Sequence, residues 1–382
     1  MDIWLFLLVF CAILIGWLLG RWQPFAKNSG RNDCDEFNED YVKGLNYLLT
    51  DDSDNAIKVF TNLIEVNKDT IEIHVALGNL FRSKGEVDRA IKVHQNLLAR
   101  PNLTRKQRHM AISELASDYL KAGLLDRAEQ LYREMIELNS DVPEAHKKLL
   151  DLFIIEKSWL EAADSAETLF DLHEPGINII LSQCLCEIAD TAIESRNIGL
   201  ARKTLKRAID VDHKCVRASL LFIKVNLSVD DSAAAEKIFQ RLCQQSPEYL
   251  ELYLEPAKQI YTGKSEKVYQ QFLHDQYQTH HSTPVAIALL EYYADHEDID
   301  KAQNFLSDIL LKSPSFEAFE FALRFLKSNP DQLDDTWERL SAFLKTVQSK
   351  KSEFNCGQCG YESHSMQWLC PSCRNWASMK PV

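Results

Sequence analysis

The sequence has few of the residues that interrupt helices and few basic residues. It contains 12 glycines and 11 prolines in 382 residues, which argues against many short strands joined by tight turns. Its 43 Lys and Arg against 56 Asp and Glu give a net charge of −13. Binding nucleic acid requires a basic face, so we expect no nucleic-acid partner. The few glycines and prolines favour a mostly helical protein, and a hydrophobic content of 46% is ample for a sizeable core.

The sequence also lacks the motifs that are typical of enzymes. No Ser–His–Asp set, glycine-rich phosphate loop or catalytic pair of carboxylates stands out. His280 and His281 are adjacent in an expected loop, where we interpret them as solvated. We therefore predict that the protein is not an enzyme.

An uncharged apolar run covers residues 3–20. As a helix it would be about 27 Å long, close to the ~30 Å of a bilayer's hydrocarbon core. A cleaved signal peptide would have a basic start and a small-residue cleavage site, whereas here Asp2 precedes the run and GRWQPFAK follows it. We therefore predict a retained transmembrane helix over residues 1–20.

The charges around this span predict its orientation. Arg21, Lys27 and Arg31 follow it in a short linker, residues 21–34, so the positive-inside rule places the bulk of the chain in the cytoplasm. Gly16 and Gly20 have the spacing that lets two spans pack closely, which is compatible with a homodimer.

An alanine recurs through the middle of the chain at gaps of 34, 38, 34, 39, 34 and 67 residues, the last gap covering two repeats with Val268 between them. The alanines are Ala56, Ala90, Ala128, Ala162, Ala201, Ala235 and Ala302. Nine residues before these positions, five of eight residues are aromatic, although aromatics make up only 10% of the chain. This pattern resembles the tetratricopeptide repeat, a helix–turn–helix unit whose small residue lets the two helices approach.

The resemblance implies about eight repeats over residues 35–328, followed by a terminal helix over 329–352. Gly85, Gly123 and Gly263 would end first helices in a left-handed conformation. Pro256 falls inside the expected first helix of the seventh repeat, which it should kink or shorten. We expect irregular packing around residues 175–190 and 245–283.

Ten cysteines are present. Six of them have no framework spacing, and we interpret them as free thiols in a reducing compartment: Cys11, Cys34, Cys184, Cys186, Cys215 and Cys243. The other four form two Cys-x-x-Cys pairs, which suit a tetrahedral Zn²⁺ or Fe ion: Cys356, Cys359, Cys370 and Cys373.

These pairs define a module over residues 353–382. About thirty residues cannot build a stabilising core, so the metal should hold the module together. Tyr361, Trp368 and Trp376 should cap the site or form its contact with the last helices. His364 could also serve as a ligand, although four cysteines already complete a tetrahedron.

The terminal string NCGQCGYESHSMQWLCPSCRNWASMKPV resembles the rubredoxin-type module of the lipopolysaccharide assembly protein B family. The order of anchor, basic linker, repeats and module also resembles that family over the whole chain. The resemblance implies an all-α tetratricopeptide-repeat superhelix, with an N-terminal transmembrane helix and a small C-terminal module. The module's cysteines at positions 356, 359, 370 and 373 would bind one iron or zinc ion.

The resemblance also implies a function, that of an inner-membrane regulator of lipopolysaccharide synthesis in a Gram-negative bacterium. Such an adaptor would help a membrane AAA+ protease to degrade the deacetylase that commits precursor to lipid A. It would also gather other lipopolysaccharide synthesis or transport proteins at the membrane.

Two alternatives remain at this point. Free-standing rubredoxins usually have glycine directly after the second cysteine pair, where this chain has Arg374. This departure weakens the inference of electron transfer more than it weakens the inference of metal binding. The first alternative is nevertheless a membrane-tethered redox carrier or redox sensor. The second is a zinc ribbon that contacts nucleic acid, against which the tail from Lys350 offers only four basic and two acidic residues.

The predicted anchor can be tested directly. A reporter fused after Arg31 should report the cytoplasm, because the basic residues follow the span. Mass spectrometry of the mature protein should recover residues 1–20, whereas an N-terminus beyond residue 20 would mean a cleaved signal peptide.

Overall fold

The computed structural model describes most of the chain between residues 52 and 321, and residues 352–382. The described ranges are 13–14, 17, 42–44, 46–47, 52–66, 71–138, 142–262, 265–296, 299–312, 318–321 and 352–382. Of the predicted anchor only Ile13, Leu14 and Trp17 fall within them, all three in helical conformation. None of the helices among the described residues has the length and apolar character needed to span a bilayer. The predicted linker and the predicted terminal helix lie almost wholly outside these ranges.

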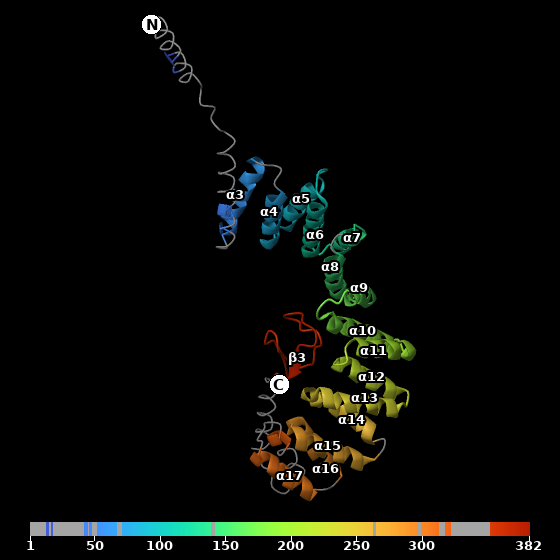
Figure 1. The fold of residues 1–382 in the computed structure, drawn as a ribbon. Helices are drawn as coiled ribbons and strands as arrows, with labels where there is room; N and C mark the ends of the chain where they lie inside the picture. The colour runs from blue at the N-terminus through green and yellow to red at the C-terminus, as the bar shows by residue number, and fades with distance from the viewer. Residues whose placement is uncertain are drawn as a thin grey trace, which may run out of the picture. The chain divides into compact units, whose positions relative to one another are not determined.

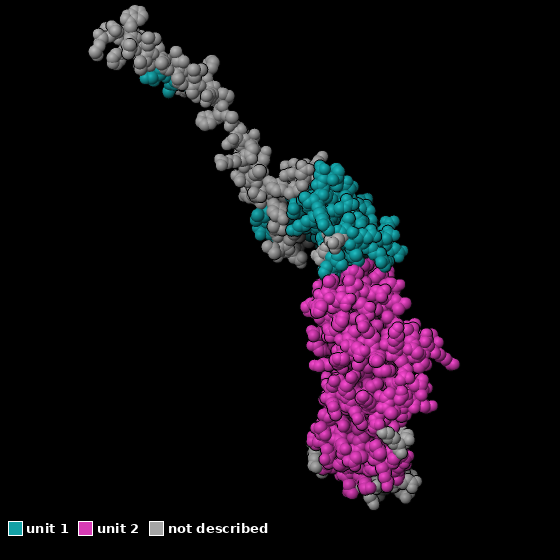
Figure 2. Space-filling model, turned by 45° about the vertical axis from the view of Figure 1, so that its right-hand side comes forward, with its two compact units in different colours: residues 1–145 teal, residues 146–382 magenta. Residues whose placement is uncertain are grey.

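The chain divides into two compact units, residues 1–145 and 146–382 (Figure 2). The first unit consists of helices in which each packs on the next (Figure 1). Their bounds are α3 (Ser53–Val66), α4 (Ile71–Ser83), α5 (Val87–Leu98), α6 (Arg105–Lys121) and α7 (Leu125–Glu137).

The second unit continues the same helix-pair arrangement and ends in a small three-stranded sheet. Its helices are α8 (Val142–Glu156, which starts just before the unit boundary), α9 (Trp159–Asp171), α10 (Ile177–Glu194), α11 (Ile198–Val211), α12 (Val216–Ser228), α13 (Ser232–Gln245), the 3₁₀ turn η1 (Pro247–Tyr249), α14 (Leu250–Thr262), α15 (Glu266–His280), α16 (Thr283–Asp295) and α17 (Ile299–Lys312). Its strands are β1 (Phe354–Cys356), β2 (Glu362–Ser363) and β3 (Met379–Pro381).

The recurring alanines occupy the positions that the repeat pattern predicts. All seven are buried, with exposed fractions of 0–1%, and each lies in the second helix of a pair. Four residues after six of them, the side chain is completely buried as well: Phe60, His94, Tyr132, Ala166, Leu205 and Phe239. The small side chain therefore sets how closely the helices of each pair approach, and the residue one turn later fills the space beside it.

In five of the repeats, the turn inside the helix pair is described and has a left-handed residue five positions before the alanine. Gly85 and Gly123, at φ +81° and +75°, confirm the prediction for two repeats. In three other repeats the same position is non-glycine, with φ between +57° and +60°: Lys157, Arg196 and Asp230. The next residue's N–H donates to a carbonyl in the first helix, as Ser158 does to Phe153 at 2.9 Å. The hydrogen-bonded turn thus holds these side chains in a conformation that glycine adopts more readily.

The predicted phase of the seventh repeat is wrong by one residue. Val268 is 41% exposed, whereas Tyr269 and Leu273 face the core with exposed fractions of 6% and 0%. Measured to Tyr269, the 67-residue gap divides into 34 and 33 residues. The tyrosine stands where other repeats have alanine, and its ring packs edge-on against that of Tyr292 at 6.1 Å.

The irregularities have specific causes. α6 and α10 contain 17 and 18 residues, longer than their neighbours, which accounts for the 38- and 39-residue gaps. α14 continues through Pro256 and, at 13 residues, is as long as α12, so the proline does not shorten it.

The cysteines outside the C-terminal module are free thiols where the structure describes them. Cys184, Cys186 and Cys215 are buried and Cys243 is half-buried. Burial raises the pKa of Cys184 and Cys243 to about 12, which makes these thiols poor nucleophiles. Cys11 and Cys34 lie outside the described residues.

The second repeat of unit 1 accommodates a histidine in its core. His94 is completely buried, and its Nδ1 lies 2.5 Å from Oδ2 of the buried Asp118. Arg82 donates to Oδ1 of Asp118 at 2.8 Å, so the buried carboxylate has a cationic partner. Gly78 makes room for the ring, because a Cβ there would lie 2.3 Å from Nε2.

Replacing a recurring alanine tests the packing. Ala128→Trp should lower the free energy of unfolding by ~1–3 kcal/mol or more, because the indole must push two helices apart. Lys121→Ala, an exposed position in the last turn of α6, is the control and should change stability little. Equal melting temperatures for the two variants would contradict the assigned core positions.

Candidate metal centre

The four predicted ligands lie on two similar turns attached to the small sheet. The strand order is β2-β1-β3, both pairings are antiparallel, and Cys356 at the end of β1 pairs with Met379 in β3. In the first turn, Gly360 N donates to Cys356 O at 2.9 Å, and Cys356 N donates to Tyr361 O at 2.8 Å.

The second turn repeats this geometry. Arg374 N donates to Cys370 O at 2.9 Å, and Cys370 N donates to Asn375 O at 3.1 Å. Gly360 and Arg374 occupy equivalent positions, with φ of +72° and +55°. Arginine therefore adopts the left-handed conformation here, and the departure from the rubredoxin pattern leaves the turn intact.

The four sulfurs are brought together at a spacing suited to one metal ion. All four lie within 4.8 Å of one another. The Sγ atoms of Cys356 and Cys373 are 3.7 Å apart, as are those of Cys359 and Cys370. Tetrahedral ligation with bonds of about 2.3 Å requires sulfur–sulfur distances of about 3.8 Å. The donor set therefore fits zinc or iron, and His364 does not belong to it.

Hydrogen bonds and crowding give the thiols unequal acidity. The hydrogen bond with Ser378 lowers the pKa of Cys356 to about 6, aided by the backbone N–H groups of Cys359 and Gln358. The backbone N–H of Asn375 lowers the pKa of Cys373, but burial and the neighbouring thiols outweigh it and raise the value to about 11. A bound cation would remove this conflict, because it favours thiolate at every ligand.

Burial is uneven around the site. Cys356 and Cys370 are buried, Cys373 is half-buried and Cys359 is exposed. The only other buried hydrophobic residues in the module's core are Phe354 and Met379. So small a core supports the prediction that the metal stabilises the module.

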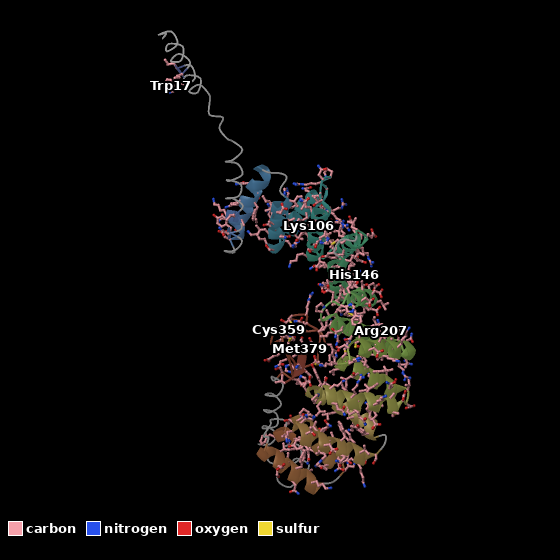
Figure 3. The ribbon with its side chains drawn as sticks, viewed as in Figure 1. Trp17, Lys106, His146, Arg207, Cys359 and Met379 are labelled. Atoms are coloured by element: carbon pink, nitrogen blue, oxygen red, sulfur yellow. The ribbon has the colours of Figure 1, made fainter. Side chains whose placement is uncertain are left out.

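The module packs against helices in the middle of unit 2 (Figure 3). Trp376 meets Trp159 at the start of α9 edge-on, with ring centroids 6.3 Å apart. The hydroxyl of Tyr249 in η1 donates to the carbonyl of Met379 at 3.3 Å. Trp368 packs against the core cluster of the neighbouring helices.

The predicted roles of the module's aromatic residues are partly wrong. Trp368 and Trp376 do form the contact with the helices, but Trp376 reaches α9 rather than the last helices of the array. Tyr361 is 36% exposed and is not a buried cap. No local sequence pattern marks Trp159 and Tyr249, because each contacts a residue more than 100 positions away.

Comparison with known proteins identifies both the C-terminal metal module and the repeat region of this chain. Residues 354–381 match the family model described as a rubredoxin metal binding domain, and residues 73–107 match a tetratricopeptide repeat model. Lipopolysaccharide assembly protein B of Haemophilus influenzae is 34% identical over 99% of this chain and 98% of its own. The chain belongs to the lipopolysaccharide assembly protein B family. The Escherichia coli K12 member is 30% identical over 99% of this chain and 97% of its own.

The solved structures that match this chain are more distant in sequence. The C-terminal part of a TPR repeat-containing protein from Cytophaga hutchinsonii is 13% identical, with a TM-score of 0.44, over 65% of this chain and 99% of that one. A tetratricopeptide repeat protein from Parabacteroides merdae has a TM-score of 0.37 at 13% identity, over 67% of this chain and 98% of that one.

Removing one ligand tests the metal centre. Cys356→Ser should abolish stoichiometric metal binding, because three thiolates and a hydroxyl hold zinc or iron poorly. Losing a metal whose apparent binding energy is ~10–16 kcal/mol in small zinc modules should unfold the module. Tryptophan emission should shift to the red as Trp368 and Trp376 become exposed, while helical circular dichroism stays nearly unchanged.

The matched control is Cys243→Ser, which alters a free thiol outside the module. It should retain one metal ion per chain by elemental analysis. Wild-type protein without bound iron or zinc would contradict the assignment of the site.

Proposed function

We propose that this protein regulates lipopolysaccharide biosynthesis as a non-enzymatic adaptor. The observation that carries the proposal is its identity of 34% and 30%, over nearly the full chain, to two proteins named lipopolysaccharide assembly protein B. The module supports the proposal too, because Trp376 and strand β3 contact the helices. A metal centre that is held against the helices in this way would stabilise the protein surface around it.

The proposed mechanism is delivery of a substrate to a protease. The adaptor brings the lipid A pathway deacetylase to a membrane AAA+ protease and so limits the flow of precursor into lipid A. It also gathers other lipopolysaccharide synthesis or transport proteins. A high effective concentration supports this mechanism, because an anchor at residues 1–20 followed by a fourteen-residue linker would hold the helices at a typical distance of roughly 20 Å from the bilayer.

This proposal includes a location and a topology. The protein would sit in the bacterial inner membrane with a single span, and the bulk of the chain would face the cytoplasm, where one chain could pair with another. Free thiols at Cys184, Cys186 and Cys215 are compatible with that reducing compartment.

The alternative is a membrane-tethered redox carrier or sensor in which iron cycles between oxidation states. The exposed Cys359 is the ligand through which an electron-transfer partner would approach. Reversible bleaching of an iron-loaded protein by a physiological reductase would favour this alternative over the adaptor.

Complementation tests the adaptor function. In an Escherichia coli strain lacking its own lipopolysaccharide assembly protein B, this chain should lower the deacetylase level, as measured by immunoblot after protein synthesis is stopped. A variant without residues 1–20 should fold but restore turnover poorly, because it is no longer concentrated at the membrane.

Cys243→Ser serves as the control for expression and should restore turnover like the wild type. Deacetylase decay that is equally slow with and without the wild-type chain, at matched expression, would contradict the proposed mechanism.

A further inference from the structure

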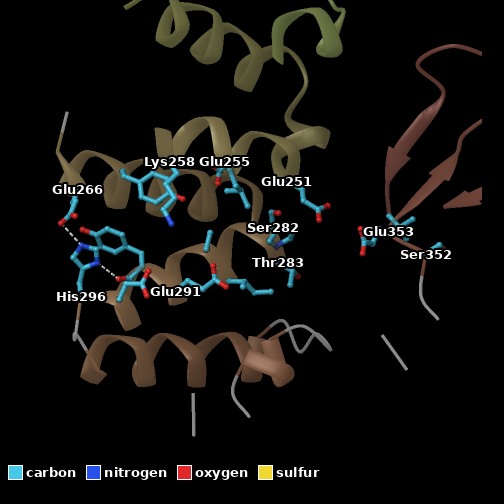
Figure 4. A pocket seen from close by; sticks show the side chains of 18 residues that line it. Glu251, Glu255, Lys258, Glu266, Ser282, Thr283, Glu291, His296, Ser352 and Glu353 are labelled. Carbon is cyan, nitrogen blue, oxygen red and sulfur yellow. Dashed lines mark hydrogen bonds and ion pairs between the residues drawn. The ribbon is translucent and has the colours of Figure 1, made fainter. Parts of the chain in front are cut away.

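A groove of about 990 Å³ lies in unit 2 among α14, α15 and α16. Figure 4 shows the Glu266–His296 pair at one end and the first residues of the metal module, Ser352 and Glu353, at the other. Glu251, Glu255 and Glu291 lie between these ends. Because the volume is at the upper end of the range for ligand sites, it accommodates several amino-acid side chains.

The groove has an apolar and aromatic lining. Leu254 of α14 and Ala288 of α16 contribute to it, and both also pack against the core of the unit. Ile287 adds a third aliphatic side chain, while Tyr269 and Tyr292 contribute two rings in edge-on contact. Such a lining suits side chains with apolar stems rather than a small hydrated ion.

The charges that line the groove are predominantly negative. Four of its carboxylates form no ion pair with any of the described residues: Glu255, Glu291, Asp295 and Glu353. Among the described side chains, Glu255 accepts a hydrogen bond only from the neutral amide of Gln259, at 2.8 Å. A fifth carboxylate, Glu266, pairs with His296 at 2.8 Å. Among the described residues, the other cation of the lining is Lys258.

The pKa values of the two tyrosines reflect the negative charge of these carboxylates. Burial raises the pKa of Tyr269 to about 12, and the carboxylates of Glu255 and Glu291 add to the increase. Burial and Glu266 raise the pKa of Tyr292 in the same direction. The carboxylates from α14 and α16 therefore act on the interior of the groove, where a cationic side chain would be stabilised.

We propose that this groove binds a segment of a partner protein that carries lysine or arginine side chains beside apolar ones. Lysine and arginine combine an aliphatic stem with a cationic head, so they match both the apolar lining and the carboxylates. An anionic lipid or a nucleic acid would be repelled. The inference rests on the proposed adaptor function, for which it names the class of partner segment.

Peptide binding to the full-length protein tests the inference. A fluorescein-labelled nonapeptide of alternating lysine and leucine should bind in a fluorescence anisotropy titration, whereas one of alternating glutamate and leucine should not. The triple variant Glu255→Gln, Glu291→Gln, Glu353→Gln should bind the lysine peptide about tenfold more weakly, as expected for losing three partly screened ion pairs.

A second triple variant makes the same change in net charge outside the groove: Asp171→Asn, Glu194→Gln and Asp210→Asn. All three positions are exposed, on α9, α10 and α11, and form no ion pair with described residues. This control should bind the lysine peptide like the wild type, and both variants should keep the wild-type melting temperature.

The outcomes separate the inference from the proposed function. If both triple variants bound the lysine peptide equally weakly, the peptide would be attracted to the acidic protein in general. That result would contradict the proposal that the groove is the binding site. No binding to the wild type, as would follow if residues 322–351 of the same chain fill the groove, would also overturn it. A third outcome is that a groove variant that no longer binds the lysine peptide supports normal deacetylase turnover. That result would agree with the adaptor function and would contradict a role of the groove in it.

Discussion

The close approach of paired helices at the recurring alanines is the constraint on which the rest of the structure depends. A helix pair of this size cannot bury its apolar face alone, so each pair relies on its neighbours. An alanine with no exposed surface, such as Ala162, lets the second helix lie close to the first. That stack positions Trp159, three residues earlier, where it meets Trp376 of the metal module. Packing of the repeats therefore forms the surface of α9 on which the metal module packs.

The metal module forms part of the groove through two residues that flank its sheet, Glu353 and Val382. Glu353 precedes β1 and lines the groove, and its carbonyl accepts a hydrogen bond from Val382 at 3.0 Å. The core of the module is small, so we expect it to hold these residues in place only when the cysteines bind a metal. A metal ion bound by the four cysteines would thus help to position one carboxylate of the acidic groove, although none of the cysteines lines it.

Local patterns in the sequence predicted the repeat period, the buried alanines and the four sulfurs, because each is fixed by spacing along one or two turns. They failed at Tyr269, since a large ring in a position usually held by alanine is recognisable only from its contact with Tyr292. They also missed the left-handed Lys157 and Arg196, because no side-chain type marks that turn as glycine does. The contact of Trp376 with α9 joins residues 217 positions apart, and no local periodicity encodes it.

That long-range contact changes how the second unit would respond to a pulling force. An open stack of repeats can unzip from its end, one helix pair at a time. Here the C-terminal strand is attached to Tyr249, and the neighbouring tryptophan to α9, so α9 to α17 lie within a loop closed by the module. Tension applied to the C-terminus would first load the module's contacts and its metal–sulfur bonds. The metal centre would then act as a mechanical clamp that resists extraction of the chain from this end.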